Sequence, residues 1–281
     1  MLTSLRTAVC HLSVIPVGVR FRKVPEGREG EVLVFFPFAG LLIGMVPAAI
    51  LVLATLATSR GSWLAAALTA AAFVLVSGAA GLMDLAATVD AAASDRPGAE
   101  ALTEDPGRHI GPHGTVAIAL SLLIRFGALT TLTLPVAVTS ESGAAYAASL
   151  AGAVIAVLLA CTLGRWAAVV LAAYSEYVRP EGGEDEWMVR YCGAREFRWV
   201  LVPVAAVAGA AVAASLLKYT QLGWLQVIVA VLAALGTAYL ASLYFEKRFG
   251  GITGRQLGAV TDVAETAVLT ICAMSALRMI A

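Results

Sequence analysis

Seven long apolar stretches, almost free of charged side chains, constrain this chain more than any other feature. Each holds roughly the 20 residues that an α-helix needs to cross the hydrocarbon core of a bilayer. They cover approximately residues 32–58, 62–83, 114–138, 143–171, 199–217, 222–245 and 257–277. Of the 281 residues, 60% are hydrophobic and only 14% are charged, too few to cover the surface of a soluble domain. The sequence therefore predicts an all-α, polytopic membrane bundle of about seven transmembrane helices, formed as a single domain over residues 1–281.

The N-terminal segment contains a shorter apolar run, which ends at Pro16 and is followed by three basic residues. A signal peptide places its basic residues before the apolar run. We therefore expect this segment to remain in the mature protein as an amphipathic or re-entrant lead-in. The four cysteines have no paired spacing, which predicts neither a disulfide framework nor a zinc site.

Charged residues are distributed unevenly between the two sides of the predicted bundle. The total charge is zero, but segments 1–31, 84–113, 172–198 and 246–256 fall on one side. These segments contain 14 of the 19 Lys and Arg and 16 of the 19 Asp and Glu. Because basic loops mark the cytoplasmic side of a membrane protein, we expect this side to be cytoplasmic and to carry the chemistry.

Four ionisable residues fall inside the predicted spans, namely Arg125, Arg165, Asp262 and Glu265. An ionisable side chain inside a membrane costs about 2.5 kcal/mol or more, so it normally faces the protein interior or a wet cavity. Asp262 and Glu265 lie three residues apart and share one helical face, and the two arginines are their candidate counter-charges. A structural ion pair that only fixes helix packing is the alternative interpretation.

Five segments, in order along the chain, resemble the motifs of the adenosylcobinamide-GDP ribazoletransferase family. The most specific is RFGGITGRQLGAVTDVAE, residues 248–265, which is similar to the C-terminal signature R-x-G-G-x-T-G-D-x-L-G-A-x-x-E. The other four are FFPFAGLLIG (35–44), GLMDLAATVDA (81–91), ALTEDPGRHIGPHG (101–114) and GRWAAVVLAAYSEYVRPEG (164–182). Together the matches cover essentially the whole chain.

The resemblance implies an activity and a setting. Members of the family join adenosylcobinamide-GDP to α-ribazole or its 5'-phosphate, release GMP and use Mg²⁺. A ribose hydroxyl attacks the phosphate that is attached to cobinamide. The implied setting is the inner (cytoplasmic) membrane of a bacterium or archaeon, with the active loops in the cytoplasm. The implied partners are the corrinoid nucleotide, α-ribazole, the lipid bilayer, and either further copies of this chain or other cobalamin-assembly proteins, without nucleic acid.

The resemblance also identifies candidate site residues. Mg²⁺ prefers carboxylates and substrate phosphate oxygens, and glycine-rich turns that open into helices offer N–H groups to phosphates. The candidate catalytic residues are Asp84, Asp90 and Asp262. The candidate Mg²⁺ ligands are Asp84, Asp90, Asp105 and Asp262. The candidate substrate-binding residues are Arg108, Arg165, Arg179, Gly250, Gly251, Thr253, Gly254, Arg255 and Glu265.

The chain departs from the family pattern at several acidic positions. Ala87 replaces one motif aspartate and Gly107 takes the place of another. In the C-terminal signature Arg255 stands where the family has aspartate, and Asp262 stands where it has glutamate. Arg255 is a candidate to contact a substrate phosphate directly through its guanidinium fork. The departures predict a rearranged carboxylate set, and they leave open a degenerate paralogue that binds a corrinoid or a partner without turnover.

Two other kinds of membrane protein are alternatives. A small-molecule transporter would also place charges inside spans, but it is expected to show an internal repeat or paired broken helices, and no convincing repeat is evident. A phosphotransferase of the CDP-alcohol type would carry the motif D-G-x-x-A-R, which is absent.

Two polar features outside the motifs are predicted to be structural. His11 lies in the apolar lead-in, where we expect a packed or interfacial side chain. The acidic segment EGGEDEWM, residues 181–188, is typical of a solvated loop.

Overall fold

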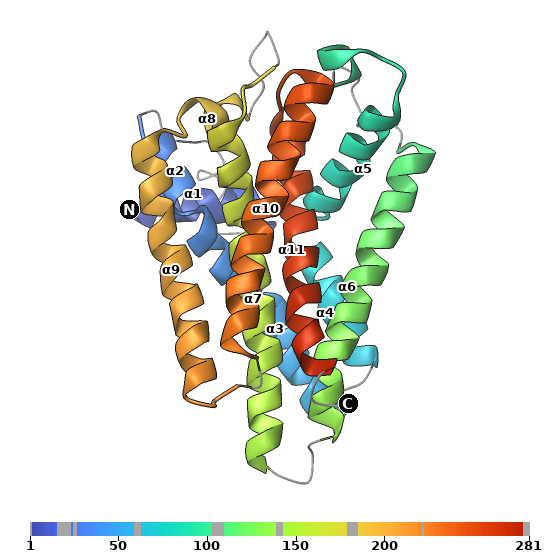
Figure 1. Ribbon diagram of the computed structural model, residues 1–281, viewed down its shortest axis with the longest axis vertical. Helices are drawn as coiled ribbons and strands as arrows, with labels where there is room; N and C mark the ends of the chain where they lie inside the picture. Colours follow the sequence, from blue (N-terminus) through green and yellow to red (C-terminus); the bar gives the residue numbers. More distant parts are fainter. Residues whose placement is uncertain are drawn as a thin grey trace.

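The structure, a computed structural model, describes residues 2–15, 24, 27–58, 63–102, 110–138, 143–178, 185–220 and 222–277. These residues form an all-helical bundle (Figure 1). The helices are α1 (Leu2–Leu12), α2 (Glu29–Val34), α3 (Phe36–Ala57), α4 (Trp63–Val76), α5 (Ala80–Ala93), the 3₁₀ helix η2 (Gly98–Leu102), α6 (Pro112–Val138), α7 (Gly143–Tyr174), α8 (Glu186–Arg190), α9 (Ala194–Leu216), α10 (Trp224–Phe249) and α11 (Gly254–Leu277).

The helices that can cross a membrane agree with the predicted bundle. Among the described residues, α3, α6, α7, α9, α10 and α11 are each long and apolar enough to span a bilayer. Helices α4 and α5 give a seventh crossing if they are taken together, although they meet at an angle of 80°. The predicted second span, 62–83, is therefore wrong as a single straight helix, because α4 ends at Val76 and α5 begins at Ala80.

The break between α4 and α5 has a local backbone cause. Gly78 and Ala79 adopt φ values of 63° and 61°, which end a right-handed helix. Glycine tolerates this conformation, whereas for alanine it costs about 1–2 kcal/mol. The Val14 N–H donates to the Val76 carbonyl at 3.0 Å, so the N-terminal segment satisfies a carbonyl that the break leaves open. Non-helical backbone at membrane depth is tolerated in this way where protein covers it.

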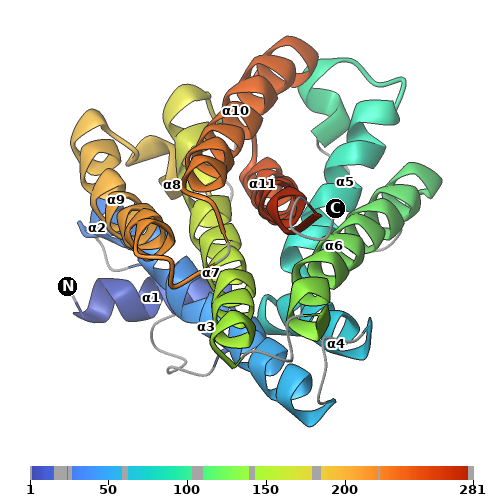
Figure 2. The ribbon, with the colours of Figure 1, turned by 60° about the horizontal axis from the view of Figure 1, so that its bottom comes forward.

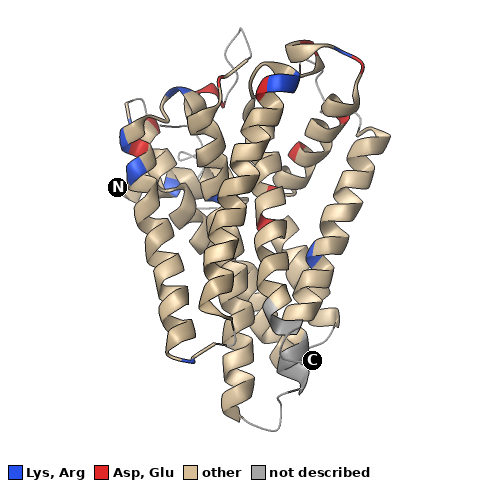
Figure 3. Ribbon diagram, in the orientation of Figure 1, with Lys and Arg blue, Asp and Glu red and all other residues tan. Residues whose placement is uncertain are grey.

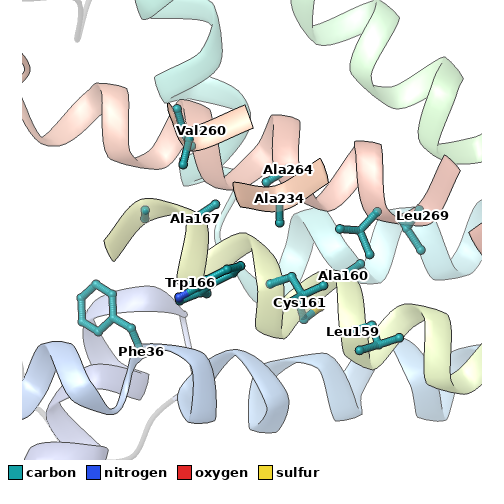
Figure 4. Close-up of a cluster of buried hydrophobic side chains, with 14 of the residues drawn as sticks. Phe36, Leu159, Ala160, Cys161, Trp166, Ala167, Ala234, Val260, Ala264 and Leu269 are labelled. Carbon is teal, nitrogen blue, oxygen red and sulfur yellow. The ribbon is translucent and has the colours of Figure 1, made fainter. Parts of the chain in front are cut away.

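Helix α7 lies at the centre of the bundle, between α3 and α11 (Figures 2 and 4). Glycines permit the close approach. A Cβ atom at Gly44 of α3 would lie 2.8 Å from the Cβ of Cys161, and one at Gly164 of α7 would lie 2.5 Å from the Cγ of Glu265. Gly40, four residues before Gly44, faces the same part of α7. Small residues at this spacing let membrane helices pack closely, which explains the glycines of the segment FFPFAGLLIG.

The charged side chains gather at the end of the bundle that holds α2 and α8 (Figures 1 and 3). Asp84 and Asp90 lie within α5, although the sequence predicted a loop there, because the surrounding Ala, Leu and Met residues favour a helix. Residues six apart point about 120° away from each other around a helix axis. The two aspartates consequently face different neighbours.

Candidate functional site

Seven ionisable side chains from the described part of the chain line a pocket of about 260 Å³ inside the bundle. Residues of α1, α3, α4, α5, α6, α7 and α11 line it, together with the beginning of α8. The break between α4 and α5 contributes Ser77 and Ala80 to its wall. The ionisable side chains that line the pocket are His11, Asp84, Arg125, Arg165, Asp185, Asp262 and Glu265.

The floor of the pocket is a buried network of two arginines and two carboxylates. Arg125 of α6, only 2% exposed, donates to Asp262 Oδ1 at 2.8 Å and to Glu265 Oε2 at 3.3 Å. Arg165 of α7 pairs with Glu265 from the other side. Ser121 of α6 donates to Asp262 Oδ2 at 2.5 Å. The predicted counter-charges of Asp262 and Glu265 are thus confirmed, and the network carries no net charge.

Asp84 and Asp185 form the acidic wall of the pocket, and both carboxylates rest on glycines of α11. A Cβ atom at Gly258 would lie 2.7 Å from Asp84 Cγ, and one at Gly254 would lie 2.6 Å from Asp185 Cγ. The two glycines are one helical turn apart, about 6 Å along the axis. The two carboxylates repel each other, while Arg255 attracts Asp84. The glycines of the C-terminal signature therefore make room for the acidic side chains.

His11 enters the same pocket from α1. Its Nε2 atom lies 3.6 Å from Asp185 Oδ1, and its ring contacts the rings of Phe36 and Trp187. His11 is packed, as the sequence predicted, but it also faces an acidic partner. Asp185 is 38% exposed on its side chain, which agrees with the predicted solvated segment at this residue, and it also lines the pocket. The part of that segment at 181–184 lies outside the described residues.

Asp90 lies apart from the acidic wall and caps α6. Its Oδ2 accepts the N–H of Gly111 at 2.7 Å, and its Oδ1 accepts the N–H of Gly114 at 2.8 Å. A carboxylate at a helix N-terminus satisfies N–H groups that have no partner within the helix and complements the helix dipole. Side chains at either glycine would collide with Asp90. This contact explains the spacing of the two glycines in the segment RHIGPHG.

The glycine-rich turn between α10 and α11 packs against the segment that follows α7. The Ile252 N–H donates to the Glu176 carbonyl at 2.8 Å. Gly251 has a φ of 148°, and a side chain at this position would collide with Glu176. Gly250, with a φ of 79°, ends α10. Gln256 accepts hydrogen bonds from the N–H and hydroxyl of Thr253, which fixes the start of α11.

Arg248, at the beginning of the signature, binds the other end of α5. Its guanidinium donates to the carbonyls of Ser94 at 2.6 Å and Arg96 at 3.0 Å, and its Nε donates to Ala92 at 3.4 Å. Cationic side chains stabilise the carbonyl end of a helix. The signature therefore holds α5 in place at its C-terminal end.

The structure brings together part of the predicted site. Asp84, Arg165, Gly254, Asp262 and Glu265 line the pocket. The predicted site residues Gly250, Gly251, Thr253, Arg255 and Asp90 are not among the lining residues. Asp105, Arg108 and Arg179 lie outside the described residues.

The carboxylates differ in how many partners they already have. Both oxygens of Asp90 and both of Asp262 accept hydrogen bonds. Asp84, in contrast, accepts none from any described residue, so it has the fewest such partners among the predicted ligands that the structure describes. Within the described parts of the chain, no group of three or more His, Cys, Asp or Glu side chains is arranged to hold a metal ion.

Comparisons with known proteins identify the family. The family described as cobalamin-5-phosphate synthase matches residues 4–273 of this chain. Proteins called adenosylcobinamide-GDP ribazoletransferase are similar over nearly the full length. The one from Rhizobium etli (strain CIAT 652) is 30% identical over 269 residues, 95% of this chain and 94% of that protein. The one from Ectopseudomonas mendocina (strain ymp) is 33% identical over 278 residues, 96% of this chain and 98% of that protein.

A third relative, from Chlorobaculum parvum, is 32% identical over 288 residues, 98% of this chain and 96% of that protein. No solved structure matches the chain. These findings confirm the resemblance that the five ordered motifs indicated. The chain belongs to the cobalamin-5-phosphate synthase family.

Proposed function

We propose that this protein is an adenosylcobinamide-GDP ribazoletransferase, which assembles the nucleotide loop late in cobalamin biosynthesis. The observation that carries the proposal is the family match over residues 4–273, together with near-full-length relatives of that name. The substrates are adenosylcobinamide-GDP and α-ribazole or its 5'-phosphate. The relatives' names do not favour the alternatives of a degenerate paralogue or a transporter.

The reaction replaces one phosphorus–oxygen bond by another. A ribazole hydroxyl oxygen bonds to the phosphorus attached to cobinamide, and the bond from that phosphorus to the oxygen that leaves with GMP breaks. Such a transfer needs mainly positioning of the reactants and neutralisation of charge. The pocket of about 260 Å³ is smaller than the roughly 300–1,000 Å³ of sites for drug-sized ligands. It therefore holds the reacting phosphates, and the rest of both substrates lies outside it.

His11 in the pocket and Arg255, which is not among its lining residues, are proposed to act on the reacting groups. Arg255, which is near enough to attract Asp84, donates to a phosphate oxygen. His11 accepts the proton of the attacking hydroxyl, because imidazole is the side chain suited to proton transfer near neutral pH and Asp185 stabilises its charged form. Arg165 and Glu265 form the floor and fix the depth of the pocket.

Asp84 and Asp185 fit a Mg²⁺ ion that also binds substrate phosphates. Mg²⁺ is commonly held by one or two carboxylates plus phosphate oxygens, and these two carboxylates repel each other in the same pocket. When bound, Mg²⁺ neutralises charge that develops on the phosphate oxygens. The predicted ligands Asp90 and Asp262 would first have to give up hydrogen bonds from Gly114 and Ser121 of α6, so Asp84 and Asp185 form the favoured set.

The membrane setting supports a cytoplasmic site. The protein is multi-pass, and its charged side chains gather at the end of the bundle toward which the pocket lies (Figure 3). The positive-inside rule assigns that end to the cytoplasm of a bacterial or archaeal inner membrane, where nucleotide substrates are available. Further copies of this chain or other cobalamin-assembly proteins are the expected protein partners.

The test is direct synthesis. Purified protein in bilayers is given adenosylcobinamide-GDP, α-ribazole-5'-phosphate and Mg²⁺, and mass spectrometry measures the cobalamin product and GMP. We expect product that disappears with EDTA.

Asp84→Asn should lower the rate about 100-fold, and Asp185→Asn should raise the Mg²⁺ concentration for half-maximal rate about tenfold. Asp95→Asn, an exposed change beyond the end of α5, is the matched control. Absence of product from folded wild-type protein would overturn the proposal.

A further inference from the structure

An apolar groove of about 710 Å³ runs along the outside of the bundle, away from the catalytic pocket. It lies between α3, α7 and α9, which adjoin one another (Figure 2). Ala206, Val207 and Ala210 of α9 form one side, and Ile155 and Leu158 of α7 form the other. Among the residues that the structure describes, no charged side chain lines the groove. The groove runs along three helices that can cross the membrane, so it lies at the level of the lipid acyl chains.

A second, charged cavity of about 710 Å³ continues the groove toward the charged end of the bundle. Val34, Phe35 and Trp199 line both, so the two cavities form one continuous site. Trp199 is 58% exposed at this junction. Tryptophan is enriched at the boundary between lipid and water, which places the charged cavity at the level of the headgroups.

The charged cavity carries both signs of charge. Glu29, Glu31 and Glu196 supply carboxylates, and Arg190 and Arg195 supply guanidinium groups. Arg190 also approaches Glu186 at 3.7 Å and is mostly exposed. Arg195 and Glu196, in contrast, form no ion pair with any described residue. A ligand with both a cationic and an anionic group would complement this arrangement.

Two glycines leave room for the Glu196 side chain. A Cβ atom at Gly30 would lie 2.8 Å from Glu196 Cγ, and one at Gly193 would lie 2.8 Å from Glu196 Oε2. The carboxylate therefore lies between α2 and the start of α9, at the cavity wall. The next residue toward the N-terminus, Arg195, brings a guanidinium to the same cavity.

We propose that this continuous site binds one phospholipid with a zwitterionic amine headgroup, of the phosphatidylethanolamine class. An acyl chain fills the groove, the ammonium group binds the Glu196 carboxylate, and the phosphate binds Arg195 through charge-assisted hydrogen bonds. An anionic lipid would bring no cation to the Glu196 carboxylate, and a choline headgroup has no N–H to donate to it. The proposal depends on membrane insertion and not on the transferase reaction, so the two can fail separately.

The test is selective lipid retention by the full-length protein. The protein is reconstituted in bilayers with equal amounts of phosphatidylethanolamine, phosphatidylcholine and phosphatidylglycerol, extracted in mild detergent, and examined by native mass spectrometry. Ala206→Trp fills the groove, and Arg195→Gln removes the phosphate contact. Leu240→Trp, on the exposed outer face of α10, is the matched control. Circular dichroism and gel filtration establish that each variant is folded.

We expect wild type and Leu240→Trp to retain one phosphatidylethanolamine. Each of the two site variants should lower its occupancy about tenfold, as expected for loss of a charge-assisted contact or of the acyl-chain space. Equal retention of all three lipids would overturn the proposal, since it would show only the general lipid shell. Unchanged retention by folded Ala206→Trp and Arg195→Gln would also overturn it, as would a co-purifying protein that occupies the groove instead.

Discussion

Gly258→Ala tests whether the glycines of α11 set the position of the acidic wall. The new methyl group would lie 2.7 Å from Asp84 Cγ and 2.8 Å from Asp84 Cβ. Carbon atoms in contact prefer about 3.5–4.0 Å, so the carboxyl group must retreat by about 1 Å. A displacement of about 1 Å in a catalytic group can cost about 100-fold in rate, which corresponds to about 2.7 kcal/mol in the activation free energy.

The substitution should leave the fold intact. Alanine is about 1 kcal/mol better than glycine in a helix interior, and this offsets part of the packing cost of about 1–3 kcal/mol for an added group in a packed interior. Gly236→Ala in α10 is the matched control, because a Cβ atom there meets nothing within 4 Å. Rates are measured by product formation in bilayers, and thermal stability is measured by gel filtration after heating.

A double-mutant cycle with Asp84→Asn assigns the loss of rate to its cause. If Gly258 acts through Asp84, the double variant should be no slower than Asp84→Asn alone. A wild-type rate for folded Gly258→Ala would refute the reasoning. So would rate losses that simply multiply in the double variant, because that result would mean that the glycine and the aspartate act independently.

Two further changes test the buried contacts. Arg125→Met should lower the unfolding free energy by about 3–5 kcal/mol, because it leaves Asp262 without its charged partner in the interior. The double variant Arg125→Met/Asp262→Leu should recover most of this loss in a thermal-shift measurement. A double variant that is no more stable than Arg125→Met would contradict the pairing. Asp90→Ala should cost about 0.5–2 kcal/mol, as the loss of a helix N-cap does, and should lower the thermal midpoint more than the transferase rate per folded molecule. A rate loss without any change in stability would instead support a direct catalytic role of Asp90.

The membrane topology could be predicted because each crossing helix must be long and apolar enough to span the hydrocarbon core, and both properties are visible in its own sequence. Apolar length identifies six crossings and the helices of the seventh. The ion pairs of Asp262 and Glu265 could be predicted for a related reason, since a charge inside a span requires a partner. The break at Gly78 and Ala79 could not, because the apolar run continues through it and the covering contact comes from Val14, far away in the chain.

The missed residues, His11 and Asp185, owe their place to tertiary packing. Neither belongs to a recognisable pattern, and they meet only because α1 and the beginning of α8 both pack near the start of α11. The glycines of the signature could be recognised as important, but their purpose could not be deduced. Glycine is expected both in a turn that binds phosphate and at a position that leaves space for a neighbouring carboxylate, because both require a residue without a side chain. The sequence alone does not distinguish the two purposes.

The buried network of arginines and carboxylates also imposes an order on biogenesis. Arg125 and Arg165 enter the membrane with α6 and α7, whereas their partners arrive with α11, the last helix that the structure describes. Asp262 and Glu265 follow Arg125 by 137 and 140 residues, respectively. Until α11 has been synthesised and has packed, two cations lie in the membrane without compensation, at a cost of about 2.5 kcal/mol or more each. A chain that stops before α11 therefore lacks the carboxylates that pair with Arg125 and Arg165 in the complete bundle.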